Sequence, residues 1–82
     1  MSTYPRLDAK ITITYANDVS SKRGVPYIAV GHRGENGFEH NLWFPSEFAD
    51  FAKSHIGKQV TATFLFYSSR ERTTLTGVAL SE

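Results

Sequence analysis

The segment "SSKRGVPY", residues 20–27, places two cationic side chains, a glycine and a proline directly before an aromatic ring. A single-stranded nucleic acid needs cations along its phosphates, which Lys22 and Arg23 could supply, and flat rings on which its bases stack, such as Tyr27. Later in the chain, the segment "YSSRER" repeats this combination of a ring and cations with Tyr67, Arg70 and Arg72. These residue types predict contacts to phosphate and to bases.

Two further residues belong to the same prediction. Trp43 alternates with apolar neighbours in "FEHNLWF" and shares its face with Glu39 and Asn41, so its ring is expected to point outward. Arg33 ends the preceding apolar run and adds a cation. The complete set of residues expected to contact nucleic acid is Lys22, Arg23, Tyr27, Arg33, Trp43, Tyr67, Arg70 and Arg72.

Catalytic and metal chemistry have weak support. His32 and His40, taken with Asp18 or Glu39, do not match a ligand motif, and Ser68 and Ser69 lack a nucleophile elbow. The glycines of "GHRGENG" do not precede a helix, so they favour a hairpin over a phosphate loop. We therefore predict no catalytic residue, no metal site and no cofactor, and a protein that is not an enzyme.

The composition indicates one small soluble domain. The chain has 82 residues, a hydrophobic fraction of 40%, a net charge of +1 and no cysteine. This charge is far from the strongly basic profile of duplex-binding proteins, so a nucleic-acid interface depends on where the cations lie. Without an apolar run of about 18 residues, no membrane span is expected. We predict a single domain over residues 1–82, with residues 1–8 as a flexible N-terminal arm, in the cytoplasm.

The hydrophobic pattern predicts five strands and one helix. Period-two alternation favours strands over residues 10–15, 38–44 and 58–67. Residues 25–32 and 74–81 are also expected to be strands, with a loop over residues 16–24. The period changes to three and four in the segment from Ser46, a candidate N-cap, to His55. Gly57 is expected to end this helix, and Gly77 to mark a bend or bulge in the last strand.

The alternation also predicts which side chains face the core. We assign to the core face of the sheet Ile11, Ile13, Tyr15, Phe38, His40, Leu42, Phe44, Val60, Ala62, Phe64 and Phe66, and to the inner face of the helix Phe48, Phe51, Ala52 and His55.

The order of elements predicts a mainly β fold: a five-stranded, OB-like Greek-key barrel with one helix between the third and fourth strands. The OB-fold has its helix at this place and binds ligands on its second and third strands and on the loops that join strands 1 and 2 and strands 4 and 5. Lys22 and Arg23 fall in the first of these loops, and Arg70 and Arg72 in the second. A nearly neutral chain can therefore carry one basic face.

The residues Ser21, Arg23, Gly24, Pro26 and Tyr27 resemble a motif of filamentous bacteriophage single-stranded DNA-binding proteins of the gene V protein type. Those proteins have a serine and a basic residue, then glycine, one residue, proline and tyrosine after the first strand. The resemblance implies an OB-like homodimer that coats viral DNA in the host cytoplasm with little sequence preference. It also implies that Tyr27 stacks on a base and that Lys22 or Arg23 contacts phosphate.

Two functional hypotheses follow. The first is a non-enzymatic single-stranded DNA-binding protein encoded by a phage, with RNA as the other nucleic acid that the same features fit. The second is a small phage or mobile-element protein that binds and inhibits a host protein complex, because Trp, Tyr and Arg are also the preferred anchors of protein interfaces. A structural interpretation stands beside both: outward rings can be covered by the helix or a partner subunit, and loop cations are often only solvated.

Overall fold

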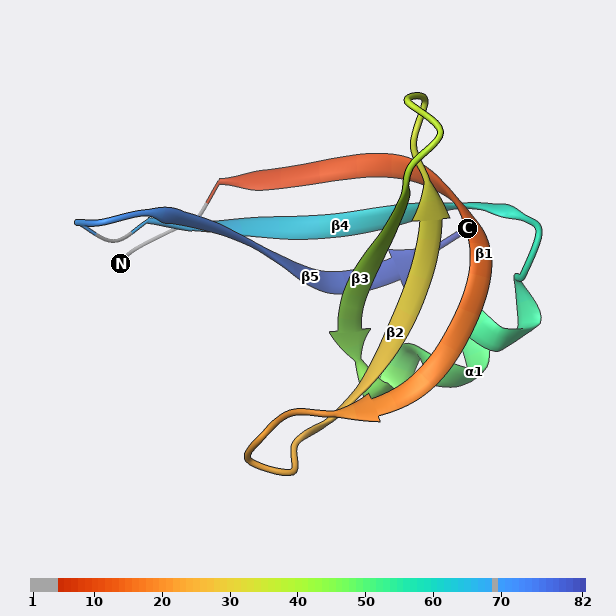
Figure 1. Cartoon of the computed structure of the whole chain (residues 1–82), viewed down its shortest axis with the longest axis horizontal. Coiled ribbons are helices and arrows are strands. Elements are labelled where there is room, and N and C mark those ends of the chain that lie inside the picture. The colour runs from red at the N-terminus through yellow and green to blue at the C-terminus, as the bar shows by residue number, and fades with distance from the viewer. Residues whose placement is uncertain (1–4, 69) are drawn as a thin grey trace.

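The computed structural model describes residues 5–68 and 70–82. In this part of the chain, five antiparallel strands form one sheet, with the order β3-β2-β1-β4-β5. The strands are β1 (Arg6–Ser20), β2 (Pro26–Arg33), β3 (Glu39–Pro45), β4 (Gln59–Ser68) and β5 (Thr73–Ser81). Figure 1 shows how the sheet curls, with β3 and β5 as its two edge strands. The mainly β class and the five predicted strands are confirmed.

The strand β1 is the longest element and is longer than predicted. Its first half, from Arg6 to Thr12, pairs with β4, and its second half, from Ile13 to Ser20, pairs with β2. The loop predicted to begin at residue 16 is therefore wrong over residues 16–20. Asn, Asp and Ser favour turns locally, but pairing with β2 supplies their backbones with ladder partners, and tertiary pairing outweighs this propensity.

The flexible arm predicted for residues 1–8 is wrong where the structure describes it. Arg6, Leu7 and Asp8 pair with Leu65, Phe64 and Thr63 of β4, and the backbone N–H of Phe66 donates to the carbonyl of Pro5 at 3.0 Å. Residues 1–4 of this arm lie outside the described residues.

The segment between β3 and β4 contains a shorter helix than predicted. A 3₁₀ turn, η1 (Ser46–Phe48), comes first, and the α-helix α1 extends only over Ala49–Ser54. Ser46 makes no capping hydrogen bond, because the chain tightens into η1 directly after Pro45 and α1 begins only after Phe48. Gly57 adopts a φ of +83°, as expected of a residue that ends a helix, and its N–H donates to the carbonyl of Ile13 at 2.7 Å.

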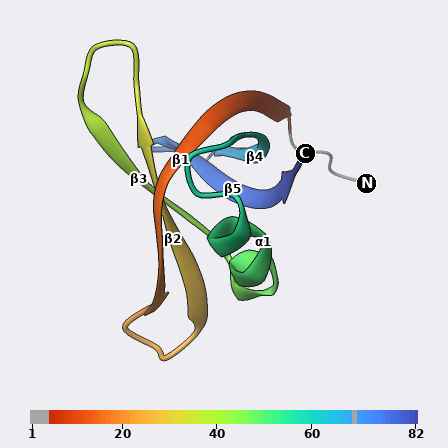
Figure 2. The same cartoon turned by 90° about the vertical axis from the view of Figure 1, so that its right-hand side faces the viewer.

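The core lies on the concave face of the sheet, where α1 covers it. Figure 2 shows α1 within the curl that the strands form. Half-buried Phe48 and Phe51 pack against the core. The core consists of Ile11, Ile13, Ile28, Val30, Phe44, Ala52, Val60, Ala62, Phe64 and Leu80. No helix in the described part of the chain has the length and apolar character that a membrane crossing needs.

Two residues assigned to the core face are exposed. Phe38 is 69% exposed and precedes β3, and His40 is exposed one residue into that strand. The hairpin that joins β2 and β3 extends away from the other described strands and from α1 (Figure 1), so these residues lie outside the part of the sheet that encloses the core. The alternation of apolar and polar residues in and before β3 therefore continues past the end of the core.

Candidate nucleic-acid interface

Tyr27 and Trp43 lie side by side on the convex face of the sheet. Their strand neighbours Ile28 and Phe44 are paired with each other and fully buried, so the alternation of side chains turns Tyr27 and Trp43 to the opposite face. The two ring centroids are 5.5 Å apart, with a tilt of 39°, and Trp43 is 40% exposed. The predicted outward orientation of Trp43 is confirmed, and its ring is accessible for stacking.

Tyr15 is a third ring on this convex face, which the sequence pattern placed in the core. The pairing of β1 with β2 shifts between Ile13 and Tyr15, so one extra residue of β1 stands opposite β2 and reverses the direction of Tyr15. Tyr15 lies against Gly31, where an added Cβ would come within 2.2 Å of its ring. A glycine within a strand signals this close approach, and Gly31 was the clue in the sequence. Tyr15, Tyr27 and Trp43 together form the outer aromatic patch.

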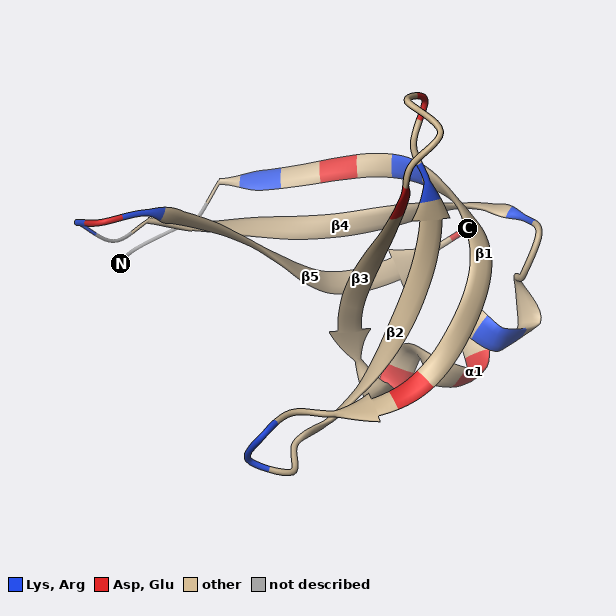
Figure 3. Cartoon of the chain, viewed as in Figure 1, with Lys and Arg blue, Asp and Glu red and all other residues tan. Residues whose placement is uncertain are grey.

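The loop between β1 and β2 holds Lys22 and Arg23 at its tip. The Ser21 N–H donates to the Val25 carbonyl at 2.9 Å, and the Val25 N–H donates to Ser21 Oγ at 3.1 Å. Gly24 completes the turn with a φ of +82°. The loop is thus a closed turn that holds two exposed cations directly before the strand of Tyr27, as Figure 3 shows in blue at the lower left.

The hairpin between β4 and β5 carries the second cationic group. Arg70 and Arg72 lie in its turn, exposed, with Glu71 between them (Figure 3). Tyr67 is 37% exposed and shares the convex face of β4 with Thr63. It pairs with Thr74 next to the β4–β5 turn, and β1 lies between β4 and β2 in the sheet, so Tyr67 is not a member of the outer aromatic patch.

Arg33 lies at the opposite end of β2 from Lys22 and Arg23. Its guanidinium is 3.7 Å from the Glu39 carboxylate across the β2–β3 pair. This ion pair compensates part of its charge and separates it from the two cationic turns, so the predicted site does not gather all five of its cations in one place.

A groove of about 350 Å³ opens between the edge strands β3 and β5, next to Trp43. Gly77 brings the two strands together, because an added Cβ would lie 2.7 Å from the Trp43 carbonyl oxygen. The predicted irregularity at Gly77 is confirmed by a register shift in the β4–β5 pairing. The lining consists of Tyr27, Asn41, Leu42, Trp43, Phe64, Leu75, Thr76 and Gly77. Sequence reasoning did not place Asn41, Leu75 and Thr76 together, because they meet only when the sheet curls.

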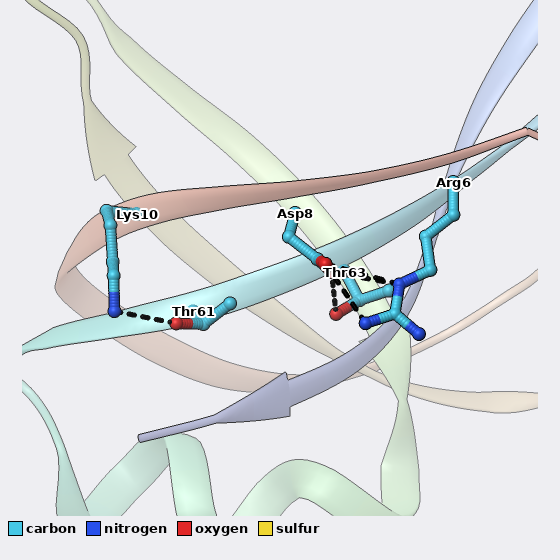
Figure 4. A network of polar contacts seen from close by, with 5 residues as sticks. All are labelled: Arg6, Asp8, Lys10, Thr61 and Thr63. Carbon is cyan, nitrogen blue, oxygen red and sulfur yellow. Dashed lines mark hydrogen bonds and ion pairs between the residues drawn. The ribbon is translucent and has the colours of Figure 1, made fainter.

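The convex side of the β1–β4 pair carries a different polar network, shown in Figure 4. The Arg6 guanidinium lies 3.0 Å from the Asp8 carboxylate, and Thr63 Oγ1 donates to the same carboxylate at 2.7 Å. These two hydrogen-bonding partners lower the pKa of Asp8 below its usual value. Lys10 donates to Thr61 Oγ1 at 2.9 Å. Arg6 and Lys10 thus bind side chains of the sheet.

The histidines considered as metal ligands take other roles. His32 Nδ1 accepts a hydrogen bond from the Thr12 N–H at 3.3 Å, and His32 stands opposite His40 in the β2–β3 pair. Within residues 5–68 and 70–82, no three His, Asp or Glu side chains gather in a way that could hold a metal ion. Glu47 and Asp50 lie on η1 and α1, and the Asp18 carboxylate binds Lys53 of α1 at 2.6 Å.

Comparison with known proteins adds no relative: no protein-family model matches the chain, and neither a curated protein nor a solved structure matches it.

Proposed function

We propose that this protein binds single-stranded DNA and catalyses no reaction. The observation that carries the proposal is the ring pair of half-buried Tyr27 and exposed Trp43, whose strands β2 and β3 lie next to a turn with two exposed cations. Stacking of a base on such a ring contributes about 1–3 kcal/mol without selecting a sequence, and cations attract the phosphates. Tyr15 extends the stacking surface across β1, so that bases bind along the outer aromatic patch and phosphates bind Lys22 and Arg23.

The proposal includes an OB-like arrangement of the sheet. The position of α1 between β3 and β4 and the approach of β5 to β3 at Gly77 support it. The motif from Ser21 to Tyr27 supports a relationship with the filamentous phage proteins of the gene V protein type. We extend the proposal accordingly to a phage-encoded homodimer that coats DNA in the host cytoplasm.

The direct test uses the fluorescence of Trp43, the single tryptophan of the chain. Titration with oligo-dT at low salt is expected to quench the fluorescence to saturation, because a stacked base contacts the indole ring. The same concentration of duplex DNA serves as the control and is expected to quench much less. A flat titration, together with unchanged anisotropy of a labelled oligo-dT, would contradict the proposal.

The salt dependence of binding tests the cationic turns. Four phosphate contacts from Lys22, Arg23, Arg70 and Arg72 predict that log K falls with log salt with a slope of about −2.8, at about −0.7 per contact. The double variant Arg70→Ala/Arg72→Ala is expected to flatten the slope by about 1.4. The control Lys58→Ala removes an exposed cation from the α1–β4 connection and should leave the slope unchanged. An unchanged slope in the double variant would remove the β4–β5 turn from the interface.

A second candidate function has one observation in its favour. Leu7 and Leu75 are 40% and 47% exposed on the same face of the β1-β4-β5 strands, and such apolar side chains favour contact with another protein. In that case the chain binds a host protein complex, as a small inhibitor does. A pull-down that recovers one stoichiometric protein and resists nuclease would favour this function.

A further inference from the structure

We infer that the groove between β3 and β5 holds one unstacked base of the bound strand, as a subsite that shares Tyr27 and Trp43 with the outer aromatic patch. This inference rests on the proposed function. The outer aromatic patch consists of three rings on β1, β2 and β3, whereas the groove adds side chains of β3, β4 and β5: Asn41, Leu42, Phe64, Leu75 and Thr76.

The chemistry of the lining fits a base. Trp43 and Phe64 supply ring surface, and Leu42 and Leu75 supply aliphatic walls. Asn41 offers an amide and Thr76 a hydroxyl, which can both donate and accept hydrogen bonds at the edge of a base. The volume of about 350 Å³ lies at the lower end of the range of ligand pockets, about 300–1,000 Å³, and so suits a small heterocycle.

The charge distribution indicates an anionic chain as the ligand. None of the lining residues in the described part of the chain is charged, but a cationic turn directly precedes each of two lining strands, β2 and β5. Tyr27 follows Arg23 by four residues, and Leu75 follows Arg72 by three. At about 3.3 Å per residue, Arg23 and Arg72 each lie within about 13 Å of a lining residue along the chain. A strand whose phosphates contact both turns therefore crosses the mouth of the groove, which is neutral and receives the base.

The position of the groove depends on the contact at Gly77. There β5 meets the Trp43 carbonyl and the Phe44 ring, where an added Cβ would lie 2.7 and 2.8 Å away, respectively. Gly77, Asn41 and Leu75 all line the groove. The fully buried Phe44 lies against Gly77, so the core of the protein supports this lining residue.

The test compares Leu75→Ala with a matched control, Leu7→Ala. Both leucines are partly exposed, at 47% and 40%, on the same face of one sheet, but Leu7 does not line the groove. The full chain is titrated with fluorescently labelled oligo-dT and with an oligonucleotide of the same length whose sugars carry no bases. Leu75→Ala should weaken binding to oligo-dT about fivefold to tenfold, as expected for the loss of one apolar wall. It should leave binding to the abasic strand unchanged, and Leu7→Ala should change neither.

The outcomes separate the subsite from the function itself. If the unaltered protein binds oligo-dT and Leu75→Ala binds it equally well, the subsite is wrong while the proposed function stands. An equal loss of affinity for oligo-dT and for the abasic strand also contradicts the subsite. In that case the substitution at Leu75 affects binding through the structure of the β4–β5 hairpin and not through contact with a base. If Leu75→Ala instead dissociates a dimer in sedimentation without changing DNA affinity, the groove holds a second copy of the chain. Absence of binding by the unaltered protein overturns both proposals.

Discussion

At the residue scale, Asp8 shows how exposed polar side chains connect two neighbouring strands, β1 and β4. It is held by Arg6 on its own strand and by Thr63 on β4, and both partners are hydrogen-bonded to its carboxylate. Because these hydrogen bonds favour the charged carboxylate, the pKa of Asp8 is lower in the folded protein than in the unfolded chain. The first half of β1 is thereby attached to β4 by side chains as well as by the backbone ladder.

This lowered pKa predicts a specific pH dependence. The stabilisation by Asp8 is complete above the usual carboxyl pKa of 3.8 and is lost as the pH falls through the lower pKa of the folded state. Asp8→Asn should therefore melt at a lower temperature than the unaltered protein at pH 7, and the difference should shrink progressively as the pH falls below 3.8. Thermal melts followed by circular dichroism measure this. Glu35→Gln, in the exposed β2–β3 turn, is the control, and a pH-independent difference for Asp8→Asn would contradict the assignment.

At the element scale, β5 depends on a glycine to reach β3. These two edge strands are not neighbours in the hydrogen-bonded order of the sheet, yet Gly77 lies against the backbone of Trp43. The register shift in β4–β5 beside Gly77 bends the strand towards this contact. The curl of the sheet, and with it the groove, therefore depends on a position that has no side chain.

Gly77→Ala tests this dependence. Its Cβ would meet a backbone oxygen and a buried ring, neither of which can move easily, so the variant should lose about 2 kcal/mol of unfolding free energy. Chemical denaturation measures the loss, and the Trp43 emission should shift as β5 moves away. Gly34→Ala is the control, since the nearest atom there belongs to the Asn36 side chain, and it should cost less than about 0.5 kcal/mol. Equal stability of the two variants would show that β5 does not pack closely against β3 at Gly77.

At the scale of the whole molecule, one apolar core joins all five strands and α1. Phe44 of β3 is fully buried, and its ring centroid lies 5.7 Å from that of Phe64 of β4, so the two distant parts of the sheet meet through these rings. A domain of this size has a marginal stability of about 5–15 kcal/mol. The contacts of a single core ring therefore contribute a large share of the unfolding free energy.

Phe44→Ala is expected to lower the unfolding free energy by about 3–5 kcal/mol, because it removes ring contacts and leaves a cavity. Denaturant unfolding followed by circular dichroism checks this value. Phe38→Ala is a matched control with the same chemical change at a ring that is 69% exposed, and it should cost less than about 0.5 kcal/mol. A loss at Phe38 as large as at Phe44 would mean that the β2–β3 hairpin packs against something in solution.

Local patterns predicted much of the fold and part of the site. The hydrophobic pattern identified all five strands, and alternation identified the buried face of β4, since one residue in two faces the core along a regular strand. Turn residues identified the two cationic turns. The same rule was wrong for Tyr15, because a bulge reverses the alternation, and for His40, because β3 extends beyond the core.

The sequence by itself determined the strands, their turns and the outward direction of Trp43, because these follow from the chemistry of near neighbours. Only the tertiary structure decided that Tyr15 joins Tyr27 and Trp43, that Arg33 binds Glu39, and that Leu75 and Asn41 line one groove. The physical reason is that register shifts and the curl of a sheet depend on pairing between segments far apart in the chain. The spacing of residues within one segment carries no information about that pairing.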